Sequence, residues 1–116
     1  MMSPENNQFN FKKGAAPLAI LSLLKKEDMY GYQLAQAVAE ASGGDFLLQE
    51  GTLYPILYRL ADGGYISEKR VLVGKRMTRV YYHLEEAGLA YYQSLLNDYR
   101  SIQRGMDRIL ADGKDA

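Results

Sequence analysis

The fold is decided by the stretch Glu50-Gly51-Thr52-Leu53-Tyr54-Pro55-Ile56-Leu57-Tyr58-Arg59-Leu60. Its leucines recur at spacings of three and four residues, which predicts a helix over residues 51–62 with one apolar stripe facing inward. The opposite face carries an unusual number of aromatic and hydrogen-bonding side chains for a helix in water. We therefore expect that face to have a binding partner.

Two stretches of alternating polarity follow this helix after a pair of glycines. Residues 66–73 and 77–84 are predicted to be strands, joined by the basic turn Gly74-Lys75-Arg76. A helix followed by a hairpin with a basic tip is the layout of a winged helix-turn-helix. In that fold the helix enters a DNA groove and the hairpin lies on the flanking phosphates.

Three further helices are predicted. The first covers about residues 13–26, with Pro17 in its first turns, and is apolar nearly all round, so it should be central and buried. The second covers about residues 32–41 and ends at Ser42-Gly43-Gly44-Asp45. The last covers residues 85–110 and carries a seam of apolar residues spaced by three and four, the pattern of a coiled coil.

The last helix would be on the order of 39 Å long, too long to be covered by the small body before it. Packing along its own domain is one interpretation of the seam. Dimerisation, with help from the first helix, is the simpler one, because an exposed apolar stripe needs cover. The predicted fold class is mainly α with a small β-hairpin, a winged helix-turn-helix plus a long C-terminal dimerisation helix. The predicted dimerisation residues are Leu18, Leu21, Tyr92, Leu95, Tyr99, Ile102, Met106 and Ile109.

Composition indicates one globular domain of 116 residues, 47% apolar and 24% charged. We divide the chain into a flexible arm (1–10), a winged helix-turn-helix domain (11–84), a dimerisation helix (85–110) and a frayed tail (111–116). No apolar run approaches the roughly 20 residues that span a bilayer, and the absence of cysteine fits the cytoplasm. A net charge of zero conceals an uneven distribution: residues 59–79 hold six bases and two acids, a net +4.

Thr52 and Tyr54 lie near the N-terminus of the third helix, the end that helix-turn-helix proteins point at base edges. Arg59, further along the helix, and the Lys75-Arg76 tip are better placed for phosphates. The alternatives are an ordinary solvated helix and a solvated turn. His83 is the only histidine, and no phosphate-binding loop or metal-ligand spacing occurs. We therefore expect no enzyme activity, cofactor or metal.

Taken together, these residues resemble the PadR family of bacterial transcriptional regulators over about residues 13–88. The resemblance implies a dimeric winged-helix repressor, often released from DNA by a small aromatic or hydrophobic molecule. The single C-terminal helix is similar to the short subgroup of the family. One departure is Leu84-Glu85, where the family usually has Leu-Thr, so the threonine cap of the last helix is missing or supplied otherwise. The motifs that carry the resemblance are Tyr30-Gly31-Tyr32-Gln33-Leu34, Gly51-Thr52-Leu53-Tyr54-Pro55 with Arg59-Leu60, Gly64-Tyr65-Ile66, and Gly74-Lys75-Arg76 leading to Tyr81-Tyr82.

We predict a homodimeric repressor that binds a pseudo-palindromic site on double-stranded DNA. A dimeric module for protein contacts and a small-molecule carrier are the alternatives. The aromatic candidates for effector binding have a second interpretation, which is filling of the dimer core. The predicted DNA-binding residues are Tyr32, Gly51, Thr52, Tyr54, Pro55, Tyr58, Arg59, Lys75 and Arg76, and the candidate effector-binding residues are Phe9, Phe11, Tyr91, Tyr92 and Tyr99.

Overall fold

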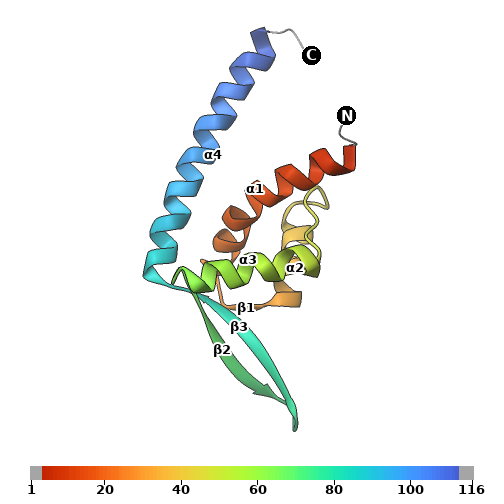
Figure 1. Cartoon of the computed structure of the whole chain (residues 1–116), viewed down its shortest axis with the longest axis vertical. Helices are drawn as coiled ribbons and strands as arrows, with labels where there is room; N and C mark the ends of the chain where they lie inside the picture. The colour runs from red at the N-terminus through yellow and green to blue at the C-terminus, as the bar shows by residue number, and fades with distance from the viewer. Residues whose placement is uncertain (1–3, 113–116) are drawn as a thin grey trace.

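Four helices and three strands make up residues 4–112, the part of the chain that the computed structural model describes; side chains are described for residues 11–111 (Figure 1). The strands form one antiparallel sheet in the order β1-β3-β2. The predicted fold class, mainly α with a small β-hairpin, is confirmed. In chain order the elements are α1 (Pro4–Leu24), β1 (Met29–Tyr30), α2 (Gly31–Ala41), α3 (Glu50–Asp62), β2 (Ile66–Val73), β3 (Met77–Leu84) and α4 (Glu86–Asp112).

α1 begins earlier than the sequence indicated. It starts at Pro4 and not near Lys13, so residues 4–10, predicted to be a flexible arm, are helical; residues 1–3 lie outside the described part. A proline is well tolerated at the first position of a helix, where its missing amide hydrogen has no partner to lose. Pro17 consequently lies inside the helix, where it leaves the carbonyl of Lys13 without its usual amide donor.

The hydrophobic core lies where α1 crosses α2 and α3. Ile20 and Leu21 of α1 are fully buried and belong to one cluster with Leu34 of α2 and with Leu53 and Leu57 of α3. This confirms the predicted central, buried first helix. Leu21, however, was predicted to contact a second subunit, and with 0% of its surface exposed it is part of the core of its own chain instead.

The sheet contains one strand that the sequence did not predict. β1 is only two residues long, too short for an alternating pattern, and pairs with β3 through Met29↔Tyr82 and Tyr30↔Tyr81. β2 and β3 have the predicted bounds and pair along their whole length, from Ile66↔Leu84 to Val73↔Met77. Gly74 in the connecting turn has φ +70, a backbone angle that favours glycine. The hairpin projects from the body as a wing (Figure 1).

α4 leaves the body at the end opposite to the wing tip, and the described chain is 60 Å along its longest axis (Figure 1). Its first half packs on the core through Tyr92 and Leu95, whereas Ile102 and Ile109 further along are exposed. Ala111 and Asp112, predicted to be part of a frayed tail, are helical; residues 113–116 lie outside the described part.

The start of α4 is joined to β2 and to the residue before β2 by two hydrogen bonds. The Ser67 hydroxyl donates to the Glu85 carboxylate, and the Glu85 amide donates to the Tyr65 carbonyl at 3.0 Å. A Cβ at Gly88 would collide with that same carbonyl, so glycine at 88 serves close packing. Gly105 has nothing within 4 Å of the corresponding position. Among residues 4–112, none of the helices combines the length and apolarity needed to cross a bilayer.

Candidate nucleic-acid interface

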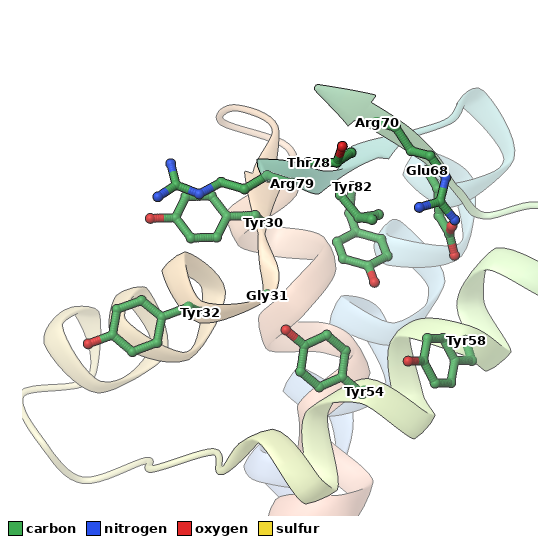
Figure 2. Close-up of a pocket in the computed structure, with 11 residues that line it drawn as sticks. Tyr30, Gly31, Tyr32, Tyr54, Tyr58, Glu68, Arg70, Thr78, Arg79 and Tyr82 are labelled. Atoms are coloured by element: carbon green, nitrogen blue, oxygen red, sulfur yellow. The ribbon is translucent and has the colours of Figure 1, made fainter. Parts of the chain in front are cut away.

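A concave surface of about 440 Å³ lies between the start of α2, the outward face of α3 and the wing (Figure 2). We call it the tyrosine groove because five tyrosines line it. They come from three parts of the fold that are distant in the sequence, and two arginines of the wing lie beside them. The lining residues are Tyr30, Gly31, Tyr32, Tyr54, Tyr58, Glu68, Arg70, Thr78, Arg79, Val80 and Tyr82.

Tyr54 is half-buried in this groove because its ring lies against the backbone of Gly31. A Cβ at residue 31 would clash with the Tyr54 ring and hydroxyl, so the glycine creates the space that the ring occupies. Burial, followed by the charges of Glu50 and Tyr58, raises the pKa of Tyr54 above its ordinary value of 10.0. Its hydroxyl therefore remains protonated at neutral pH and available as a hydrogen-bond donor.

Tyr82 contributes a second hydroxyl. Its side chain comes from β3 and points into the groove (Figure 2), although only 3% of the residue's surface is exposed. Burial, together with the nearby Glu68 carboxylate, raises the pKa of Tyr82 to about 12. The sequence placed Tyr82 on the face shared with Val80 and Leu84, and the pairing Glu68↔Tyr82 brings a carboxylate to the same face.

The start of α2 forms the other wall of the groove. The Tyr30 ring is covered by the Arg79 guanidinium, 4.4 Å from its centroid, and meets Tyr81 edge-on at 5.4 Å. Tyr32, one residue into the helix, is 54% exposed and accepts a 3.2 Å hydrogen bond from Gln36. Arg79 of β3 is therefore held over Tyr30 and lines this side of the groove.

A second concave surface, of about 200 Å³, lies on the other flank of α3. We call it the Lys13 groove, since Lys13 of α1 is its only lining residue from outside α3. It brings together four predicted DNA-binding residues, Gly51, Thr52, Pro55 and Arg59, with a lysine that the sequence did not single out. The lining residues are Lys13, Gly51, Thr52, Pro55, Ile56 and Arg59.

Lys75 and Arg76 are exposed at the wing tip and line neither groove. Thr52 and Tyr54 lie at the N-terminal end of α3, as predicted, while Tyr58 and Arg59 are exposed one turn later. The predicted residues thus lie on α2, on two flanks of α3 and at the end of the hairpin.

The candidate effector residues do not all come together. Phe11, Leu18 and Tyr99 line an apolar groove of about 460 Å³ between α1 and α4, and Tyr92 with Tyr99 lines an adjoining one of about 290 Å³. We call the two together the α1–α4 groove. Tyr91 lies elsewhere, stacked on Tyr65 with ring centroids 4.4 Å apart. The Phe9 side chain lies outside the described residues.

The single histidine pairs with one carboxylate. His83 Nδ1 lies 2.7 Å from Asp28 Oδ1, and this exposed contact joins β3 to the turn before β1. Within the described part of the chain, no three His, Cys, Asp or Glu side chains are grouped so as to hold a metal ion.

Residues 20–94 match the sequence model of the transcriptional regulator PadR-like family. The chain belongs to this family. Transcriptional regulator Rv3488 of Mycobacterium tuberculosis is 36% identical over 80% of this chain and 80% of its own length. Negative transcriptional regulator PadR of Bacillus subtilis is 30% identical over 60% of this chain, a match that spans 38% of that longer protein.

Solved PadR-like structures have the same fold. A transcriptional regulator from Clostridium thermocellum superposes with a TM-score of 0.78 at 26% identity, over 85% of this chain and 96% of its own. The Bacillus subtilis PadR in complex with operator DNA superposes with a TM-score of 0.66 at 27% identity, over 71% of this chain and 46% of its own. This PadR-like chain is a transcriptional regulator and not an enzyme.

The predicted DNA-binding set did not include several residues that this PadR-like fold places beside α3. Arg70, Arg79 and Tyr82 line the tyrosine groove, and Lys13 lines the other one. The pairing Arg70↔Val80 follows from the predicted hairpin register, so alternation was a usable signal for Arg70. No local signal identifies Lys13, because its position depends on how α1 crosses α3.

Proposed function

We propose that this PadR-like regulator binds double-stranded DNA by inserting α3 into the major groove and placing the wing on the flanking backbone. The observation that carries the proposal is the outward face of α3, where hydroxyls and a guanidinium lie between two concave surfaces lined by basic residues. Major-groove base edges are read by such donors and acceptors, and phosphates are bound by arginine and lysine. The structure of the Bacillus subtilis relative is a complex with operator DNA, which supports DNA as the partner.

Within this mode, Thr52 and Tyr54 are the residues we assign to base reading. They lie in the first turns of α3. The neighbouring Gly51 and Pro55 have no side-chain donor to offer to a base. Tyr32, Tyr58 and Arg59 suit backbone contacts, since each is exposed on the rim of a groove. Lys75 and Arg76 extend these contacts along the duplex.

The working unit in this proposal is a homodimer. α4 leaves an apolar stripe uncovered beyond the body, with Ile102 68% and Ile109 63% exposed, and Phe11 of α1 is 79% exposed nearby in the α1–α4 groove. A second copy of the chain would cover this surface through Leu18, Tyr99, Ile102, Met106 and Ile109. Two-fold symmetry then sets two α3 helices roughly 34 Å apart and calls for a pseudo-palindromic operator.

Repression is the regulatory sense we propose, and a small hydrophobic or aromatic molecule in the α1–α4 groove is the proposed release signal. Phe11, Tyr92 and Tyr99 supply aromatic surface there. Such an effector acts by binding one spacing of the two α3 helices better than another, and shifts the population only by that difference in affinity. A regulator with this partner works in the cytoplasm, where bacterial DNA is.

The first experiment compares the wild type with Tyr54→Phe, which keeps the ring on Gly31 and removes only the hydroxyl. Mobility shifts with the gene's upstream region and with a scrambled duplex, over a salt series, measure preference and affinity separately. We expect Tyr54→Phe to lose preference while keeping salt-dependent affinity. If this variant prefers the upstream region over the scrambled duplex as strongly as the wild type does, the Tyr54 hydroxyl does not read bases. Wild-type protein that binds neither duplex at low salt, but still dimerises, would favour a module for protein contacts or a carrier.

A further inference from the structure

α3 has two polar flanks, and the two concave surfaces beside it share no residue. Tyr54 and Tyr58 face the tyrosine groove, while Thr52 and Arg59 face the Lys13 groove. At 3.6 residues per turn, Tyr54 and Arg59 lie roughly 140° apart around the helix axis, and Tyr58 and Thr52 roughly 120° apart. The surface that surrounds α3 is therefore divided into two separate halves.

The dimensions of DNA indicate what the two surfaces beside α3 would contact. An α-helix with its side chains is about 10–12 Å wide, close to the width of the major groove, about 12 Å. A helix that fills the groove consequently has one sugar-phosphate backbone along each flank. These two backbones belong to opposite strands of the duplex.

We propose that Lys13 binds the phosphate backbone of the strand opposite to the one that the tyrosine groove contacts. This inference rests on the proposed insertion of α3 into the major groove. Lys13 and Arg59 are both exposed and line the same groove, which includes no acidic residue. The tyrosine groove differs, because Glu68 lies beside its arginines. The two bases of the Lys13 groove, without an acid, give it a net charge of +2, whereas the two arginines and one glutamate of the tyrosine groove give +1. The Lys13 groove is thus the more positive half, and positive charge attracts a phosphate.

The packing of α1 holds Lys13 in this position. Ala16 and Ile20, three and seven residues further along α1, are fully buried in the core. Lys13 continues the same helical stripe beyond the core, where α1 passes over the outward part of α3. Its charge is therefore carried on a buried, packed helix, so placing it beside a phosphate costs little backbone ordering.

Lys13→Gln tests the charge, and Lys26→Gln is the matched control in the turn after α1, where the side chain is also exposed. Both variants are first checked by circular dichroism. Affinity for a duplex carrying the selected operator is then measured over a salt series. We expect Lys13→Gln to flatten the slope of log K against log salt by about 0.9 per subunit, and Lys13→Arg and Lys26→Gln to leave it unchanged. An unchanged slope in Lys13→Gln overturns the proposal.

The strand assignment is tested with operators in which single phosphates are replaced by neutral methylphosphonates. In the wild type, sensitive phosphates should lie on both strands beside each α3. Lys13→Gln should reduce the sensitivity on one strand, and Arg79→Gln that on the other. If both variants lose methylphosphonate sensitivity on the same strand, the strand assignment is wrong, while the proposed DNA binding still stands. Wild-type protein without affinity for any duplex would overturn the proposed function and this inference together.

Discussion

The ring of Tyr54 occupies the space that a side chain at Gly31 would fill, so α3 and the start of α2 are interlocked beside the proposed DNA-reading residues. Neither residue has an unusual position by itself. Tyr54 is on a regular helix and Gly31 begins another. Their contact sets the direction of a hydroxyl that we assign to base reading, and it makes the two positions energetically dependent on each other.

Gly31→Ala should destabilise the protein, although alanine normally improves a helix by about 0.5–1 kcal/mol over glycine. The added methyl group forces the Tyr54 ring outward, and overpacking of this kind costs about 1–3 kcal/mol. Urea unfolding measures the cost. In Gly31→Ala/Tyr54→Ala the clash is absent, so the double variant should be more stable than the sum of the single effects. Strictly additive effects would show that the two residues do not compete for space.

The paired change Lys75→Gln/Arg76→Gln should weaken DNA binding mainly at low salt. If each residue binds one phosphate, the slope of log K against log salt flattens by about 2 per subunit. Arg100→Gln/Arg108→Gln removes the same charge from α4 on the side away from the apolar seam and serves as the control. A wing variant with the wild-type slope would place the tip outside the interface.

Ile102→Glu should convert the protein into monomers, since it puts a charge into the exposed stripe that we assign to the second subunit. Analytical ultracentrifugation measures the change in mass. Operator affinity should fall by about 10²–10⁴, because two linked half-sites bind with a high effective concentration. Ser101→Glu adds the same charge on the far side of α4 and should leave both properties unchanged. A stable Ile102→Glu dimer would locate the interface elsewhere.

Stability should fall between about pH 10 and pH 12. A tyrosine ionises near 10.0 in the unfolded chain, whereas the pKa of Tyr82 in the fold is raised to about 12. In this interval the folded state holds a proton that the unfolded state has lost, so raising the pH favours unfolding. Tyr54, whose pKa is also raised, acts in the same direction. Urea midpoints across this range should decline less in Tyr82→Phe than in the wild type. The exposed Tyr32→Phe should decline like the wild type; equal slopes in all three proteins would contradict the assignment to Tyr82.

The sequence predicted α3, β2 and β3 to within one residue because their periodic patterns are local and the chain between them is short. It failed at β1, whose two residues are strand only because β3 passes beside them. It also assigned Leu21 to the dimer interface, although this residue belongs to the core, and it did not indicate that Tyr91 stacks on Tyr65. The sequence pattern of an apolar or aromatic residue at helical spacing is the same whether the side chain faces its own core, a neighbouring ring or another subunit.

By itself, then, the sequence determined most of the helices and strands, the basic hairpin and the family to which the chain belongs, since each depends on neighbours within a few turns. Only the tertiary structure decided which distant residues lie together around α3: Tyr54 against Gly31, and Lys13 in the same groove as Arg59. These pairs join segments that are distant in the sequence. They are set by how buried faces of α1, α2 and the sheet pack against α3, which no local pattern encodes.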